Sequence, residues 1–293
     1  MLKVDKIKAL EIEGILENKV FEEVKPKVEE LQIIGSLTKE DANSIGVVGS
    51  RKMSFYGKRV CEKFVSVLSM YGFTIVSGAM YGVDMCAHDS ALKSGGRTLA
   101  VLGVGIRSFV KKKYSKALVN EITSNAKGAI ISEFEPDFDG SVWSFPKRNR
   151  IVAALSRSVL VIEASKTSGS LITVDFANDL GKDIFVVPGS IFDDNSEGKH
   201  KLIKDGAILV ETPYDILDYY GIARQKEKLN KIAFENENEK KVYLILKQEN
   251  GGYDIDTLSY LSGIDFLELT KIISKFEVGN IISVGLDNNI VLR

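Results

Sequence analysis

The chain has little cysteine, histidine, proline and tryptophan, and each scarcity excludes a class of protein. Its 293 residues include two cysteines, two histidines, five prolines and one tryptophan. Cys61 and Cys86 form neither a CxxC pair nor a metal-ligand cluster, so we expect free thiols in a reducing compartment and no bound metal. Few prolines together with 27% charged residues indicate a regular globular protein rather than a disordered one.

Long hydrophobic runs are also missing. The first residues, MLKVDKIKALEIEG, contain no apolar core of signal-peptide length. Farther along, no segment approaches the roughly 18 uninterrupted apolar residues that a membrane span needs. We therefore expect a cytoplasmic protein with no membrane partner.

An excess of positive charge is absent as well. The formal net charge is −1, whereas a domain that binds nucleic acid is often strongly basic. Any affinity for DNA would have to come from cations that cluster locally.

From residue 44 onward, short β-branched runs alternate with amphipathic stretches. The expected strands are 44–49, 73–77, 98–102, 129–132, 159–163 and 183–187. This alternation is typical of βαβ units and a parallel sheet, whose ligands bind at loops leaving the carboxyl ends of the strands. The pattern predicts an α/β protein with an extended Rossmann-like domain.

Four parts are expected along the chain. Residues 1–40 are charged and should form a short helical appendage, followed by the Rossmann-like domain over 41–221. A polar stretch predicts a linker over 222–237. Residues 238–293 contain three helix-like segments and then two apolar runs around a turn, a pattern that predicts a small winged-helix domain.

The loop that follows the expected strand 44–49, within GVVGSRKMSFYG, is a candidate anion site. Gly49 permits a tight turn, Ser50 and Ser54 supply hydroxyls, and the following helix offers unpaired N–H groups to a phosphate. Arg51 adds a guanidinium that can bind a phosphate through two hydrogen bonds. A plain turn with an exposed arginine is the alternative.

The densest group of cations lies in WSFPKRNR, residues 143–150. Its candidate DNA-contacting residues are Phe145, Lys147, Arg148, Asn149 and Arg150. Aromatic rings beside cations suit a single strand, because bases stack on the rings while phosphates meet the charges. The alternative makes Trp143 and Phe145 core anchors and one arginine an internal ion-pair partner. We expect that alternative to hold for Trp143 and for one of Arg148 and Arg150.

A third loop, EASKTSGSLIT, again joins a strand to a helix. Ser168, Gly169, Ser170 and Thr173 could form a second anion nest beside the first, or simply cap a helix. Elsewhere, His88 falls inside a helical pattern without a Ser or Asp partner, and GVG at 103–105 lacks the third glycine of a dinucleotide fingerprint. We therefore expect no catalytic residue and no cofactor.

Six motifs agree in order and spacing with a known family. They are GSRKMSFYG, SGAMYGVDMCAH, FPKRNRIVAALS, EASKTSGSLIT, VVPGS and GKHKLIKDGAILVETPYDIL. Over roughly residues 44–218 the chain resembles the DNA-processing protein A (DprA, also called Smf) family. The resemblance implies a non-enzymatic protein that binds single-stranded DNA in a basic pocket, forms a homodimer and helps load the RecA recombinase during natural transformation.

The resemblance also assigns residues. The family's pocket arginine matches Arg51, its FP-x-RNR loop matches 145–150, and its SGSLIT loop matches 168–173. Tyr81 stands where the family usually has an arginine, so one pocket cation is expected to be missing. For the expected dimer, the apolar segment 203–220 offers either a self-association surface or ordinary core packing.

Two other classes of protein remain open. The first is a nucleotide-processing Rossmann-like phosphoribohydrolase, whose PGG-x-GT signature is absent but for which Glu133 and Glu163 are possible catalytic carboxylates. The second is a winged-helix transcription regulator. Against it, residues 235–293 carry about ten acidic and about six basic side chains, which is the wrong sign for a helix that reads a DNA groove.

Overall fold

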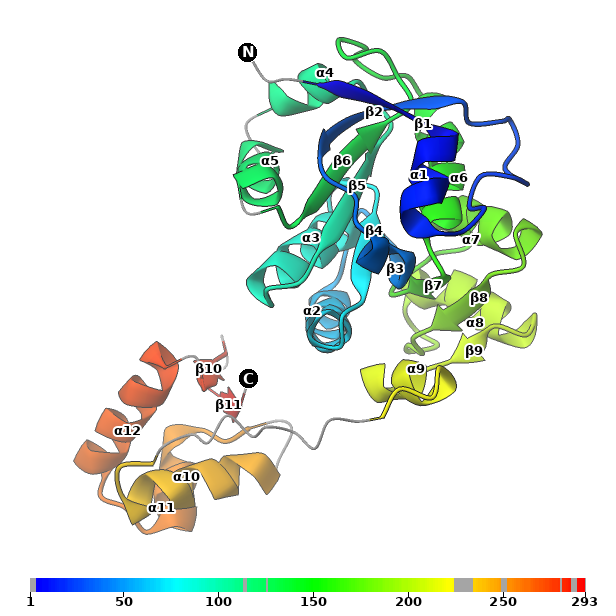
Figure 1. Ribbon diagram of the computed structural model, residues 1–293. Helices are drawn as coiled ribbons and strands as arrows, with labels where there is room; N and C mark the ends of the chain where they lie inside the picture. Colours follow the sequence, from blue (N-terminus) through cyan, green and yellow to red (C-terminus); the bar gives the residue numbers. More distant parts are fainter. Residues whose placement is uncertain are drawn as a thin grey trace. The chain divides into compact units, whose positions relative to one another are not determined.

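The computed structural model describes residues 4–112, 115–124, 126–223, 234–248, 252–279, 281–285 and 289–292. The chain divides into two compact units, Met1–Arg224 and Gln225–Arg293 (Figure 1). Most of the expected linker, residues 224–233, lies outside the described residues, so the linker remains a prediction.

Within the described residues, the larger unit is built on one nine-stranded sheet. The strands are β1 (Asp5–Lys8), β2 (Glu30–Gly35), β3 (Ser44–Val48), β4 (Thr74–Ser77), β5 (Thr98–Leu102), β6 (Gly128–Ser132), β7 (Ser158–Val161), β8 (Asp183–Val186) and β9 (Ile208–Leu209). Their order across the sheet is β1-β2-β6-β5-β4-β3-β7-β8-β9. Strands β3 to β9 pair in parallel, which confirms the α/β fold.

The six predicted strands correspond to β3 to β8 within one or two residues. Strands β3 to β7 are buried along their whole length, as expected of parallel strands covered by helices on both faces. A continuous β-branched run is therefore a dependable signal in this part of the chain.

The expectation for residues 1–40 is corrected by the structure. This segment does contain helix α1 (Ala9–Leu16), but it also supplies β1 and β2, and β2 pairs antiparallel with β6. Leu31 and Ile33 are buried in the same core as the rest of the sheet. The segment is thus part of the domain and not an appendage.

Helices cover both faces of the sheet (Figure 1). Besides α1 they are α2 (Phe55–Met70), α3 (Val83–Lys93), α4 (Ile106–Val110), α5 (Ser115–Ser124), α6 (Ser144–Leu155), α7 (Ser170–Asp179), α8 (Glu197–Lys204) and α9 (Pro213–Tyr219), with short 3-10 helices at Lys39–Ala42 and Asp194–Ser196. One face packs against α1, α6 and α7. The other packs against α2, α3 and α9 near β3 and against α4 and α5 near β6.

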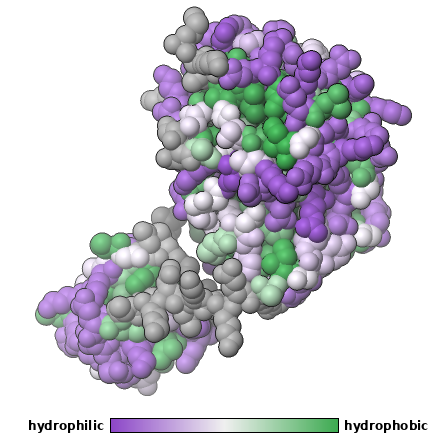
Figure 2. All heavy atoms as spheres, viewed as in Figure 1, coloured by the Kyte–Doolittle hydropathy of each residue, from purple (hydrophilic) through white to green (hydrophobic). Residues whose placement is uncertain are grey.

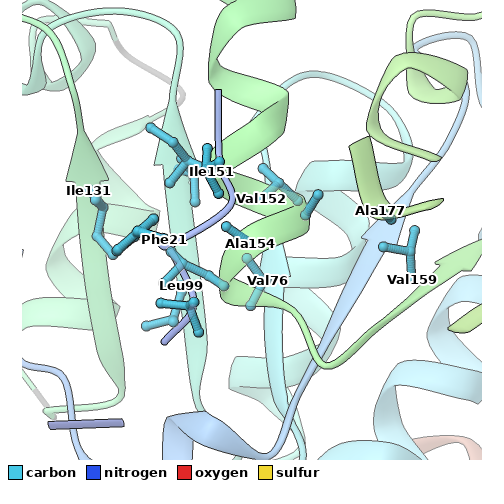
Figure 3. Packing of buried hydrophobic residues seen from close by; sticks show 14 of the residues in the cluster. Phe21, Val76, Leu99, Ile131, Ile151, Val152, Ala154, Val159 and Ala177 are labelled. Carbon is cyan, nitrogen blue, oxygen red and sulfur yellow. The ribbon is translucent and has the colours of Figure 1, made fainter. Parts of the chain in front are cut away.

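The core under α6 shows how the layers meet. Figure 3 shows Ile151, Val152 and Ala154 of α6 lying among strand residues that include Val76, Leu99 and Val159. Phe21, from the segment after α1, is buried in the same cluster. The sheet and α6 are therefore held as one rigid body, which fixes the loops at the strand ends.

The apolar segment 203–220 belongs to the core. Val210, Ile216 and Leu217 are fully buried in the cluster formed with α2 and the sheet. Leu209 and Tyr219 are about half exposed. Of the two interpretations of this segment, core packing is therefore the one that holds for Ile216 and Leu217.

The smaller unit has its own hydrophobic cluster. Its described elements are α10 (Glu237–Gln248), α11 (Ile255–Ser262), α12 (Phe266–Val278) and the antiparallel pair β10 (Ile282–Val284) and β11 (Ile290–Leu292). This is the element order expected for a winged-helix domain, and that assignment remains a prediction.

Hydrophilic residues dominate the face of the molecule in Figure 2, and hydrophobic residues gather in limited areas of it. Among the described residues, no helix combines the length and the hydropathy that crossing a membrane would require.

Candidate functional site

The strand order reverses beside β3, which has β4 on one side and β7 on the other. In open α/β sheets, this switch point leaves a crevice between the loops that follow the two diverging strands. Here those loops are 49–54 after β3 and 162–169 after β7, and both contain predicted site residues. The loops after β4 and β5 begin at the same edge of the sheet, because these strands are parallel to β3.

Close packing of the backbone shapes the loop after β3. A Cβ atom on Gly49 would lie 2.7 Å from Val83 Cγ2, and one on Gly82, where φ is +84°, would lie 2.2 Å from the Ser50 carbonyl oxygen. The Val83 amide donates to that same oxygen at 3.2 Å. Gly49 and Ser50 therefore join the loops after β3 and β4.

Arg51 is exposed at this junction. Its guanidinium carbon lies 5.8 Å from the centre of the Phe145 ring, so it meets the loop that begins α6. Among the described residues, no carboxylate forms an ion pair with Arg51. This leaves its charge available to an anion from solution.

Ser54 takes a different role from the one expected. Its hydroxyl accepts from the Gly57 amide at 3.0 Å, capping α2, and donates to Glu163 Oε1. The Ser54 amide donates to Glu163 Oε2 at 3.0 Å. Glu163 is fully buried, so a carboxylate of the chain itself occupies the helix terminus where a phosphate was expected.

Lys199 lies beyond this carboxylate and was not singled out in the sequence. It is fully buried, and its ammonium donates to the Pro188 carbonyl oxygen at 3.4 Å and lies 5.7 Å from the centre of the Tyr56 ring. Burial lowers the pKa of Lys199, and the negative charge of Glu163 opposes that shift. Together Glu163 and Lys199 fix the loops after β7 and β8.

Arg148 is buried and bonded to backbone. Its Nη1 donates to the carbonyl oxygens of Gly78 and Val101, at the ends of β4 and β5. Burial lowers its pKa to about 10, with Asp84 opposing the shift, so Arg148 stays charged at neutral pH. Burial in turn raises the pKa of Asp84. Arg148 therefore holds two strand ends together.

Arg150 is also buried and pairs through Nη2 with Glu133. The other oxygen of Glu133 lies 3.1 Å from the ammonium of Lys147, whose side chain is 34% exposed. Both arginines of the loop are thus internal, where the sequence suggested one. Only Lys147 can still contribute charge to a ligand.

Asn149 links the loop of α6 to the loop after β7. Its side-chain amide donates to the Gly169 carbonyl oxygen at 3.2 Å. In that second loop the Ser168 and Ser170 hydroxyls lie 2.7 Å apart and Gly169 is exposed, whereas Thr173 is buried. Together with the Arg51–Phe145 and Ser54–Glu163 contacts, the bond from Asn149 brings all three predicted loops into contact, with Ser168 and Gly169 toward solvent.

A cavity of about 370 Å³ opens beside Phe145, the ring that Arg51 approaches. Its lining includes Gly78, Tyr81, Gly103, Phe109, Lys112 and Phe145. Among the described residues, three aromatic residues, four aliphatic residues and two glycines form the lining, with Lys112 as its one cation. Tyr81, at the position where the family usually has arginine, is 57% exposed and adds a ring rather than a charge. Such a cavity suits a flat, weakly polar group attached to an anion.

His88 lies beneath the site and is fully buried. The Thr98 hydroxyl donates to the Ile75 carbonyl oxygen at 2.8 Å, so it must accept from His88 Nδ1, 2.6 Å away. Nε2 is buried without a hydrogen-bond partner among the described residues. Burial lowers the pKa of His88 to about 3, so the ring is neutral and structural.

This depressed pKa predicts a pH-dependent stability. Between pH 6.5 and 3 the unfolded chain binds a proton at His88 that the native chain does not, so the free energy of unfolding falls as the pH falls through that window. From pH 7 to pH 5 the loss due to His88 should be about 2 kcal/mol. Urea unfolding of wild type and His88→Asn at both pH values checks this, and an equal loss in both proteins would contradict it.

The doubly wound, mostly parallel sheet, whose strand order reverses beside β3, defines a Rossmann-like α/β protein. Residues 18–221 match the family model described as DNA recombination-mediator protein A. The chain belongs to that family.

Individual relatives agree with this membership. The chain is 40% identical over 188 residues to Protein Smf of Escherichia coli, covering 64% of this chain and 50% of that protein. It thus spans about half the length of that relative. It is similar to the X-ray structure of DprA from Streptococcus pneumoniae, with a TM-score of 0.66, 37% identity and 74% of each chain covered. DprA from Helicobacter pylori gives a TM-score of 0.62 at 26% identity, covering 75% of this chain and 96% of that one; its structure is described in terms of a single-stranded DNA binding mode.

Proposed function

We propose that the chain binds single-stranded DNA at the switch point, with a phosphate on Arg51 and a base in the adjoining cavity. The observation that carries the proposal is the pairing of an exposed arginine with Phe145, whose ring also lines the cavity. The two contacts are those that a sequence-tolerant single strand needs. Proteins of the same family, including one whose structure reports single-stranded DNA binding, support it.

Within this proposal the predicted site residues divide by the contacts that they make inside the protein. We expect Arg51, Lys147, Phe145, Ser168 and Gly169, each of them at least partly exposed, to contact DNA. The residues that shape or hold the loops are Gly49, Ser50, Ser54, Arg148, Asn149, Arg150, Ser170 and Thr173.

The enzymatic alternative finds less support. Both candidate carboxylates are engaged inside the protein, Glu133 with Arg150 and Lys147 and Glu163 with Ser54. We propose a binding protein without catalysis. Hydrolysis of a nucleoside monophosphate by the purified protein, lost on Glu133→Gln or Glu163→Gln, would favour the phosphoribohydrolase alternative instead.

Phe145→Ala should weaken single-stranded DNA binding roughly tenfold while leaving its salt dependence unchanged, because stacking on a ring releases few counterions. The measurement is fluorescence anisotropy with a labelled oligo(dT) at several salt concentrations. Phe145→Leu is the control for packing, since Phe145 also lies against Gly103. If the leucine variant binds like wild type, the ring does not stack and the base is held elsewhere.

We further propose that the protein acts as a homodimer that presents single-stranded DNA to a RecA recombinase, as the family resemblance implies. One cavity of this size holds few nucleotides, whereas two linked sites on one strand raise affinity by roughly a hundredfold or more. Affinity should therefore step upward with oligonucleotide length, and sedimentation should show a dimer at micromolar concentration. A monomer whose affinity is independent of length would contradict the dimer and leave the binding site standing.

A further inference from the structure

Trp143 is the single tryptophan of the chain and does not lie in the core. Its side chain is 55% exposed, and the neighbouring Val142 is 90% exposed. The expectation that Trp143 anchors the core is therefore wrong. A half-exposed indole leaves part of its ring available to a ligand from solution.

The ring is nevertheless held in place. It meets Phe134 edge-on, with ring centres 5.7 Å apart, and lies 5.9 Å from the ring of Phe138. Phe134 is buried and stacks on Phe138 at 4.9 Å, so the support itself is anchored. The ammonium of Lys147 lies 5.9 Å from the indole centre. Little side-chain freedom remains to be lost when a ligand stacks on Trp143.

Trp143 is also close in sequence to residues that line the cavity. It immediately precedes α6, whose first residue, Ser144, donates its hydroxyl to the Gly103 carbonyl oxygen at 2.6 Å. A Cβ atom on Gly140 would lie 2.6 Å from Val104 Cγ1 and 3.6 Å from Phe145 Cζ. Segment 140–145 is therefore packed against the wall of the cavity, and Trp143 lies two residues before Phe145, which lines the cavity.

We propose that Trp143 is a second stacking platform, which takes a nucleobase of the same strand next to the one in the cavity. This inference rests on the proposed function and deepens it, because it sets the direction in which the strand leaves Phe145. Aromatic faces accept any base, so the platform adds affinity without sequence preference.

The surrounding charges agree with a base rather than a phosphate at this position. Glu135 and Asp139 are exposed on the segment between Phe134 and Trp143. Asp137 pairs with Arg107 at 3.0 Å and with Lys111 at 3.5 Å. Asp137 is thus neutralised by two cations, whereas Glu135 and Asp139 repel phosphates and direct them toward Arg51 and Lys112. An uncharged base face tolerates these two carboxylates.

The unique indole makes the test direct. Oligo(dT) is titrated into the full chain while DNA binding is followed by anisotropy and Trp143 by its own emission. Stacking should quench the indole emission and shield the indole from acrylamide. Both changes should reach half of their full size at the DNA concentration where the anisotropy curve has its midpoint. Trp143→Ala should lose roughly tenfold in affinity with an unchanged salt slope, and Trp143→Phe should keep most of the affinity.

Tyr260→Ala is the matched control, because it removes an aromatic ring that is 87% exposed in the smaller unit. It should bind like wild type. If wild type binds DNA while the indole emission and its acrylamide quenching stay unchanged, and Trp143→Ala binds equally well, the platform is overturned and the cavity assignment survives. If anisotropy detects no single-stranded DNA binding by wild type, the proposed function fails and the platform fails with it.

Discussion

Arg51→Ala should abolish most of the affinity for single-stranded DNA. Loss of a charged hydrogen-bonding group at the phosphate should cost about 2 kcal/mol, or roughly thirtyfold in the dissociation constant. The slope of log affinity against log salt should also become shallower by about 0.7, the contribution of one phosphate contact on a single strand. Arg51 is chosen because it is the exposed arginine at the switch point, whereas Arg148 and Arg150 are internal.

Arg59→Ala is the matched control for Arg51. Arg59 is another exposed arginine, located in the second turn of α2 and outside loop 49–54, and its removal changes the net charge equally. A general electrostatic effect would weaken both variants alike, and the switch point would then not be the binding site. Arg51→Lys should retain the salt slope but lose part of the affinity, because an ammonium cannot bind a phosphate through two parallel bonds.

Arg150→Met should instead lower stability, by about 3 kcal/mol, because it leaves the Glu133 carboxylate without its buried partner. Urea unfolding measures this loss. Lys147 compensates only in part, since its side chain is itself partly exposed. The double variant Arg150→Met with Glu133→Gln should recover part of the loss, because it removes both charges together.

A DNA-binding measurement distinguishes two possible roles of Arg150, an internal partner of Glu133 or a residue that contacts the strand. Folded Arg150→Met protein should bind oligo(dT) within roughly twofold of wild type, since the guanidinium is fully buried. A variant as stable as wild type that has lost DNA binding would show that Arg150 contacts the strand. The internal assignment would then be wrong.

The central strands could be predicted from the sequence because burial on both faces demands continuous apolar runs, as in SIGVV of β3 and TLAVL of β5. Strand β2 escaped prediction. Its sequence ELQIIG is short, begins with charge and follows a charged lead-in. What makes it a strand is pairing with β6, roughly a hundred residues away, and local patterns do not carry that information.

The binding loops could also be located, because ligands in this architecture collect at the carboxyl ends of strands near the switch point. The sequence did not reveal which cations of these loops face a ligand and which are internal. Arg150 is internal because Glu133, on the loop after β6, reaches it, and Arg148 is internal because two strand ends offer it carbonyl oxygens. Likewise, the sequence predicts that Ser54 binds a phosphate, whereas in the structure the Glu163 carboxylate accepts its hydrogen bonds at the same helix terminus.

The error over Trp143 has a similar origin. A tryptophan two residues before Phe145 is usually buried, and the sequence does not reveal that Phe134 and Phe138 support it from one side only. In this chain, exposure distinguishes residues available to a ligand from residues that hold the loops, and exposure is a property of the fold.

The central claim is that the switch point binds single-stranded DNA, and one competition measurement tests it most directly. A labelled 15-nucleotide single strand is bound to the 293-residue chain and challenged with the unlabelled strand, its duplex and a nucleoside monophosphate, using wild type and Arg51→Ala. The unlabelled strand should displace the probe at least roughly tenfold better than the duplex, the mononucleotide should not compete, and Arg51→Ala should lose the preference. Equal displacement by duplex, or displacement by the mononucleotide alone, would contradict the claim.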